Sequence, residues 1–192
     1  DTSADGFKDY RHERIRFYDT VLRSVDDTIS KLLATVNADD PIVFVTGDHG
    51  EEFWERARLE TERFHDPRGV YGVGHGHALF PEVLSVPLCV SGIDINPPET
   101  VSTTDIAATL YRGLCPSTSP TVDGTPLQSP SRGDSVVLAE EVAYGYDKRA
   151  VVDGARYLVD SPHEEETIVL NTETETVRDA TPERDEALLS RL

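Results

Sequence analysis

Two short histidine-bearing segments carry the residue types best suited to bind a metal ion or an anion. The first is VTGDHGEEF, in which Asp48 and His49 are adjacent and lie between Gly47 and Gly50. A carboxylate and an imidazole can both ligate one cation, or each can ligate a different cation. The glycines let the backbone point both side chains to the same side. By itself, however, this pattern is also typical of a polar turn at the end of a strand.

The second segment is GVGHGHALF, in which two histidines alternate with glycines. Four of the six histidines fall within residues 49–77, namely His49, His65, His75 and His77. A single histidine is more often structural than functional. A Gly-His-Gly-His pattern downstream of an Asp-His-Gly turn nevertheless indicates a site, because the glycines let the backbone approach a ligand closely.

The residues around these segments predict the elements that position them. From about Tyr10 to Val36, apolar residues recur at spacings of three and four, which predicts one long amphipathic helix. The run PIVFVTG, residues 41–47, predicts a short strand buried on both faces of a parallel sheet. Ligands of such sheets bind at the carboxyl ends of strands, and Asp48 and His49 stand at that end.

The following segment predicts further α/β elements. Residues 51–74 predict a long charged loop, and loops of that length in compact domains are usually functional or mobile. We expect a helical turn over 78–85, an apolar strand over 86–91 and a helix over 103–114, which opens with the start signal Thr-Thr-Asp. Helices followed by buried strands place this part of the chain in the α/β class.

The last third of the chain has a different pattern. Residues 115–134 are rich in Pro, Ser, Thr and Gly and predict a surface loop. Beyond them, SVVLAEE, KRAVVDG, ARYLVD and TIVLN predict a small antiparallel sheet, with a hairpin turn after Asp153. A terminal helix is expected from about Thr181, which would cap it. We therefore expect two parts, an α/β portion over residues 1–134 and the small sheet with its helix over residues 135–192.

The composition limits the classes of partner. The chain has 36 acidic and 18 basic residues, a net charge of −18, and only three lysines. Nucleic acid is not expected as a partner, because no basic stripe exists to neutralise phosphates. The acidic residues are spread along the chain, which favours adaptation of the whole surface to high salt over binding of a cationic partner. With no apolar run long enough for a membrane span and no signal peptide, we expect a soluble, cytoplasmic protein of a salt-adapted organism.

Five blocks in order resemble the C-terminal half of the sulfatase family, within the alkaline-phosphatase-like superfamily. They are YDTVLRSVDDTISKLLATV, VFVTGDHGEEF, GHGHALFPEVLSVPLCVSG, STTDIAATLYRGL and VDGTPL, which run from about Tyr18 to Leu127. The resemblance implies that residues 1–134 form the C-terminal part of an alkaline-phosphatase-like mixed or parallel sheet with flanking helices. It also implies metal-dependent hydrolysis of a small sulfate ester.

The resemblance assigns roles to the histidine segments. Asp48 and His49 look like ligands of a divalent metal ion. His75 looks like the basic residue that contacts sulfate or phosphate oxygens, and His77 is a further catalytic candidate whose role stays open. Calcium is expected first because a carboxylate suits it, whereas an imidazole ligand leans toward manganese or zinc. A cation and an imidazolium would stabilise charge on the non-bridging oxygens as the ester bond breaks.

The nucleophile that the family uses has no counterpart here. Sulfatases derive it from Cys or Ser in a C-x-P-x-R setting, and Cys115 is followed by Pro-Ser-Thr. Cys89 lies in the apolar run VPLCVSG, where a buried thiol is expected. QSPSR has Pro130 and Arg132 but presents Gln128 at the nucleophile position. We therefore expect an inactive portion of an enzyme, which the absence of Met fits, and an uncovered surface that favours self-association.

Three functions stay open on this pattern. The first is hydrolysis of a sulfate ester by the metal site described above. The second keeps the fold and changes the substrate to a phosphate or phosphonate ester, or the reaction to phosphotransfer, because the same ligands serve phosphoryl transfer. The third belongs to another class, a structural or binding module without catalysis.

Overall fold

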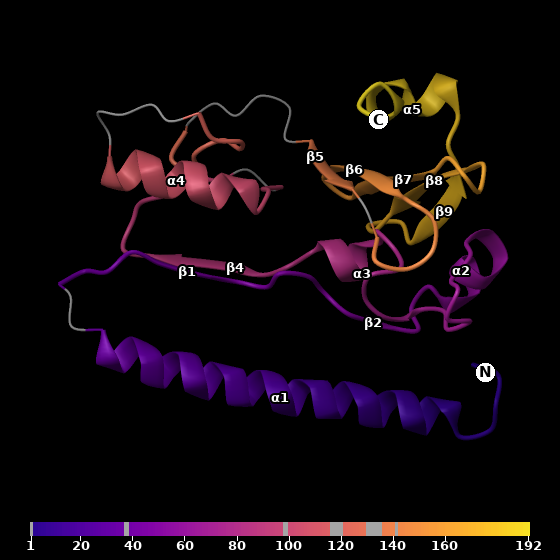
Figure 1. Ribbon diagram of the computed structural model, residues 1–192, viewed down its shortest axis with the longest axis horizontal. Helices are drawn as coiled ribbons and strands as arrows, with labels where there is room; N and C mark the ends of the chain where they lie inside the picture. The colour runs from indigo at the N-terminus through magenta and orange to yellow at the C-terminus, as the bar shows by residue number, and fades with distance from the viewer. Residues whose placement is uncertain (1, 37–38, 98–99, 116–120, 130–135, 141) are drawn as a thin grey trace.

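The computed structural model describes residues 2–36, 39–97, 100–115, 121–129, 136–140 and 142–192. In chain order its elements are α1 (Phe7–Thr35), β1 (Val43–Thr46), β2 (Glu52–Phe53), α2 (Ala57–Arg63), β3 (Val73–Gly74), α3 (Pro81–Leu84), β4 (Leu88–Ser91), α4 (Thr104–Leu114), β5 (Val137–Glu140), β6 (Arg149–Asp153), β7 (Arg156–Ser161), β8 (Glu166–Asn171), β9 (Thr176–Asp179) and α5 (Pro182–Leu189). In Figure 1, α1 and α4 flank the β1–β4 pair, and the β5–β9 sheet lies between α5 and the region of α2 and α3. The α/β class, the small antiparallel sheet and the terminal helix are confirmed.

Helix α1 forms where the apolar spacing predicts it and is anchored near one end. The rings of Phe7 and Tyr10 lie 5.3 and 5.7 Å from the ring of Trp54, and Tyr18 lies 5.2 Å from Phe53. In the described part of the chain α1 buries none of its residues. Its exposed apolar side chains include Phe17, Val21, Leu22, Val25, Leu32 and Leu33. Among the described residues, no helix combines the length and the apolar character that a membrane span needs.

Strands β1 and β4 form an antiparallel pair, in which Val45 lies opposite Cys89. This pairing differs from the parallel, fully buried strand predicted for residues 41–47. A continuous apolar run indicates burial but carries no information on the direction of its partner, and β1 is only partly buried. Cys89 is exposed, not buried as predicted, because burial alternates along β4 and Cys89 lies on the less covered face.

The segment 51–74, predicted as a loop, is an ordered unit. Strands β2 and β3 pair antiparallel, with Glu52 opposite Gly74, and α2 lies between them in the chain. Gly72 closes this unit at φ +69°, where a Cβ atom would overlap the backbone of Ala57. Two-residue strands and a charged helix leave almost no periodic signal, so the pattern of residues did not reveal them.

The C-terminal sheet holds the larger core. Its five strands pair antiparallel in the order β5-β6-β7-β8-β9, and β6 and β7 are joined at the predicted hairpin, where Asp153 lies opposite Arg156. Strand β9 was not predicted, because its side chains are polar and mostly exposed. One face of the sheet packs on buried side chains that include Phe64, Ala78, Leu79 and Phe80. The other face packs on Leu188 of α5 (Figure 1).

Helix α5 begins after Thr181 as predicted, but its capping differs. The Thr181 side chain makes no capping hydrogen bond among the described residues. Instead, the buried carboxylate of Asp185 accepts the Thr181 N–H at 2.9 Å and binds both terminal nitrogens of Arg178 at 2.7 and 2.8 Å. A bidentate, charge-assisted pair of this kind ties the start of α5 to β9.

Candidate active site

The Asp-His-Gly turn directly follows β1 and is pressed against α3. The N–H of Gly50 donates a hydrogen bond to the carbonyl of Val83 at 2.7 Å. A Cβ atom at position 50 would overlap the carbonyl oxygen of Glu82, so glycine is required for this close approach. The backbone of the turn is therefore held in place while Asp48 and His49 extend from it into solvent-accessible space.

Asp48 and His49 present two complementary ligand atoms. Asp48 Oδ1 accepts the His49 N–H at 3.0 Å and lies 3.8 Å from His49 Nε2. Hydrogen bonds from the amides of Asp48 and His49 lower the pKa of the Asp48 carboxyl, so it is ionised at neutral pH. His49 Nδ1 lies 2.8 Å from the carbonyl oxygen of Gly50, which can only accept. Nδ1 is thus assigned the proton, and Nε2 keeps its lone pair for a cation.

The spacing of these two atoms fits ligation of one ion. Metal–ligand distances of about 2.0–2.6 Å allow two ligands of the same ion to lie up to about 4–5 Å apart. The 3.8 Å between Asp48 Oδ1 and His49 Nε2 falls within that range. A carboxylate and a neutral imidazole are therefore a suitable donor pair for the divalent ion that the sequence implies.

His75 enters the same site from β3. Its ring lies 3.8 Å from the ring of His49, with a 30° angle between the planes. Its Nδ1 lies 2.8 Å from Glu51 Oε2, and the carboxylate orients the ring. His49, Glu51 and His75 each place one ligand atom within 4.8 Å of the others. The structure thus brings together two histidines that are far apart in the sequence, and it adds Glu51, which the sequence patterns did not single out.

A cavity of about 860 Å³ opens at this point and is lined by Asp48, His49 and His75. Away from these residues its walls are largely apolar and come from α3 and the C-terminal sheet, with Leu79, Leu84, Val137 and Tyr157 among them. A few polar groups in a mostly apolar cavity are the usual arrangement of a small-molecule site. Neither cysteine is among the described residues that line it.

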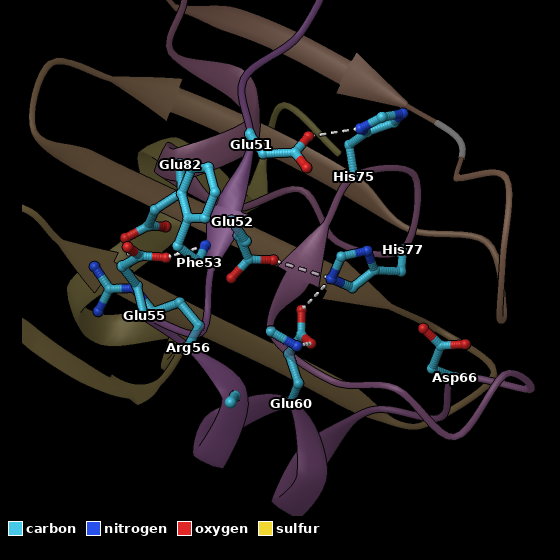
Figure 2. A network of polar contacts seen from close by, with 12 residues as sticks. Glu51, Glu52, Phe53, Glu55, Arg56, Glu60, Asp66, His75, His77 and Glu82 are labelled. Atoms are coloured by element: carbon cyan, nitrogen blue, oxygen red, sulfur yellow. Dashed lines mark hydrogen bonds and ion pairs between the residues drawn. The ribbon is translucent and has the colours of Figure 1, made fainter. Parts of the chain in front are cut away.

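His77 lies outside this cavity. It is buried, with 4% of its surface exposed, and its Nε2 lies 3.0 Å from Glu52 Oε2 and 3.1 Å from Glu60 Oε1. Figure 2 shows that His77 lies next to Glu52 and Glu60 and is separate from the contact between Glu51 and His75. The four residues singled out by the sequence therefore divide into three at the cavity and one in the interior.

The buried contacts change the protonation of their members. Burial opposes protonation of His77, but the two carboxylates outweigh it and raise the pKa of His77 to about 10. Burial raises the pKa of Glu52 to about 7, and the charge of Glu60 adds to this while His77 opposes it. Near neutral pH, a protonated His77 therefore accompanies a Glu52 carboxyl that is partly protonated.

An ionised carboxylate and two imidazoles in one cavity are chemically suited to bind a cation and an anion. Comparison with known proteins assigns the family: the sulfatase family model matches residues 1–113. That match spans more than half of the chain, so the chain belongs to the sulfatase family, and at family level it is a hydrolase. No curated protein and no solved structure matches it. The matched range contains the whole site from Asp48 to His75 and excludes the C-terminal sheet.

Proposed function

We propose that this chain carries the metal-binding and anion-contacting half of a sulfate-ester hydrolase site. Asp48 and His49 would ligate a divalent ion, and His75 would contact the sulfate oxygens. The observation that carries the proposal is the 3.8 Å approach of the His49 and His75 rings in the lining of one cavity. A cation ligand and an anion contact at this distance can act on the same ester group.

Each side chain of the site would act on a different part of the ester. A bound divalent ion acts as a Lewis acid toward an ester oxygen. Glu51 holds His75 through Nδ1, at 2.8 Å. Nε2 of His75 is then the nitrogen that remains to contact a non-bridging oxygen of the substrate. The apolar wall of the cavity would receive the organic group of the ester.

The identity of the metal is a separate proposal. Calcium was expected first, on the resemblance to sulfatases and the carboxylate ligand. Calcium sites are built from six to eight oxygen ligands, whereas nitrogen ligands suit manganese and zinc. His49 supplies an imidazole nitrogen to the proposed pair of ligands, so this donor set favours manganese or zinc over calcium.

The nucleophile is proposed to lie outside these 192 residues. Neither Cys89 nor Cys115 stands in the setting that the family uses, and neither is among the described residues lining the cavity. Residues 1–134 would then be the C-terminal portion of the sulfatase domain. Residues 135–192 would form a part that packs on it, through the core that the sheet shares with Phe64 and Phe80.

Metal and sulfate binding test this proposal directly. The chain is loaded with Ca²⁺, Mn²⁺ or Zn²⁺, metal content is measured by elemental analysis, and binding of inorganic sulfate is measured by calorimetry. We expect Asp48→Ala to lose the ion at this site and His75→Ala to keep the ion but bind sulfate at least tenfold more weakly. His12→Ala, an exposed histidine on α1, is the control and should behave like the unmodified chain. Unchanged metal loading in Asp48→Ala would contradict the assignment.

Turnover tests the missing nucleophile and the substrate class together. We expect the 192-residue chain to hydrolyse neither 4-nitrophenyl sulfate nor 4-nitrophenyl phosphate under any of the three metals. Robust hydrolysis of the sulfate would refute the absent nucleophile while supporting the substrate. Robust hydrolysis of the phosphate alone would instead favour the phosphate-ester alternative.

A further inference from the structure

A second cluster of metal-binding side chains lies in the interior, separate from the cavity. It consists of Glu52 on β2, Glu60 on α2 and His77 after β3, which are 0%, 2% and 4% exposed. Their ligand atoms lie within 4.8 Å of one another. Figure 2 shows the two carboxylates converging on the ring of His77.

These buried atoms lack ordinary hydrogen-bond partners. Among the described residues, neither oxygen of Glu52 nor Oε1 of Glu60 makes an ordinary hydrogen bond, and Oε2 of Glu52 and Oε1 of Glu60 face the ring of His77 instead. Both carboxylates approach the same nitrogen, at 3.0 and 3.1 Å, and one N–H cannot point at two acceptors at once. Buried polar atoms are nearly always satisfied, so three buried carboxylate oxygens without an ordinary hydrogen bond require an explanation.

The cluster is held in this arrangement by its surroundings. Glu60 Oε2 accepts a hydrogen bond from the N–H of Gly72, which leaves Oε1 facing His77. Glu52 stands opposite Gly74 in the β2–β3 pair, and Gly74 precedes His77 by three residues in the sequence. The three side chains are thus positioned by backbone structure on three different elements.

Among the described residues, the cations near the cluster balance its charge only in part, since Arg68 interacts with Glu60 but pairs with Asp66. Two carboxylates face one protonated imidazole, which leaves an excess negative charge whenever Glu52 is ionised. The arginines that flank the cluster in the sequence pair elsewhere: Arg56 binds Glu82 at 3.0 Å, and Arg68 binds Asp66 at 2.6 Å. Burying an unbalanced charge is strongly unfavourable, and a divalent cation would remove the excess.

The spacing also fits a coordination shell. Ligands about 2.1 Å from a metal ion lie about 3.0 Å apart in an octahedral shell and about 3.4 Å apart in a tetrahedral one. The distances from His77 Nε2 to Glu52 Oε2 and Glu60 Oε1, 3.0 and 3.1 Å, are close to the octahedral value and within a few tenths of an ångström of the tetrahedral one. Both oxygens of Glu52 lack a hydrogen bond, so this carboxylate can supply two ligand atoms.

We propose that Glu52, Glu60 and His77 form a second binding site, for a divalent transition metal ion of the zinc or manganese class. One imidazole nitrogen with carboxylate oxygens is a donor set that these ions accept. The ion would join β2, α2 and the segment after β3, and so stiffen the unit that carries Glu51 and His75. Its role is structural, because the site is closed to solvent and lies apart from the cavity.

Metal stoichiometry in a chain without the first site tests this proposal. The background is the full 192-residue chain with Asp48→Ala and His49→Ala, equilibrated with Zn²⁺ or Mn²⁺ and analysed for bound metal. We expect one ion per folded chain to remain, together with a rise in unfolding temperature when metal is added. A folded background chain that binds no metal would overturn the proposal, whatever the outcome for the proposed active site.

Variants of the ligands assign the bound ion to this cluster. In the same background, Glu52→Gln and Glu60→Gln are each expected to weaken binding at least tenfold. Glu62→Gln, an exposed residue of α2 that pairs with Arg58, is the matched control and should bind as the background does. An ion that survives both cluster substitutions would count against the assignment. If circular dichroism shows that a variant does not fold, the background chain is titrated with Co²⁺ and its visible absorption is measured. Co²⁺ bound by imidazole and carboxylate gives visible bands. The absence of such bands would refute the proposed second site.

Discussion

Glu51 and Glu52 are adjacent in the chain, but their carboxylates reach two different histidines. Glu51 Oε2 lies 2.8 Å from Nδ1 of His75 at the cavity, and Glu52 Oε2 lies 3.0 Å from Nε2 of His77 in the interior (Figure 2). Successive side chains along an extended segment point to opposite faces, which separates Glu51 from Glu52. His75 and His77 are two residues apart, a spacing that a regular strand would place on one face, but they follow β3, and Gly76 between them has φ +78° and turns the chain. One glutamate and one histidine of the Glu-Glu and His-Gly-His segments therefore lie at the open site, and the other glutamate and histidine lie in the buried cluster.

The contact between Glu51 and His75 predicts a role for Glu51 in anion binding. We expect Glu51→Gln to weaken sulfate binding to the metal-loaded chain about tenfold, or ~1.4 kcal/mol, because an uncharged amide holds the His75 ring in place less strongly than the carboxylate does. Calorimetric titration with sulfate measures the change, and Glu62→Gln serves as the control. An unchanged affinity would show that Glu51 does not act through His75.

The turn at Gly50 predicts a steric effect on the site. Because a Cβ atom there would overlap the Glu82 carbonyl, we expect Gly50→Ala to destabilise the chain by about 1–3 kcal/mol. The displaced turn should also reduce metal affinity at Asp48 and His49. Urea unfolding and metal content measure the two effects.

The matched control for this substitution lies in the same turn. At Gly47, the atom nearest to an added Cβ is the His49 carbonyl oxygen at 3.3 Å, so Gly47→Ala is expected to be milder in both measurements. Equal effects of the two substitutions would argue that the contact with α3 does not hold the turn.

The pair of Arg178 and Asp185 predicts an acid-sensitive contribution to stability. The hydrogen bonds from Arg178 hold the pKa of Asp185 at about 2, below the value of 3.8 expected in the unfolded chain. Because the folded-state pKa is depressed, this contribution is present above about pH 4 and is lost as the pH falls toward 2. Its size is about 1–2 kcal/mol.

Unfolding by urea between pH 2.5 and 5 checks this prediction against Asp185→Asn. The variant removes the titrating group while keeping the shape of the side chain, so its stability should change less over this range. It should also be less stable than the unmodified chain at pH 5. If both proteins lose stability in parallel on acidification, the Asp185 carboxyl is not the source of the difference.

The charge of the chain predicts a dependence on salt. With a net charge of −18, self-repulsion grows when the screening length rises from about 3 Å at 1 M salt to about 30 Å at 0.01 M. We expect the unfolding temperature to fall on dialysis from molar KCl to 10 mM buffer, and circular dichroism followed during heating measures it. An unfolding temperature that does not change would contradict adaptation to salt.

Several features of this protein followed from the sequence alone. The long helix α1, the hairpin between β6 and β7, and the start of α5 were predictable because periodicity and turn residues act over a few neighbouring positions. The sulfatase family was recognisable because ordered blocks around Asp48 and His75 are far more specific than any single motif. None of these features required knowledge of distant contacts.

Only the tertiary structure decided which of these residues meet. The antiparallel pairing of β1 with β4 and the exposure of Cys89 depend on strands far apart in the sequence. The division of His75 and His77 between cavity and interior depends on the pairing of β2 with β3, two strands too short to leave a pattern. Local propensities determine elements and motifs, whereas side-chain neighbourhoods are set by non-local packing that no short window of sequence contains.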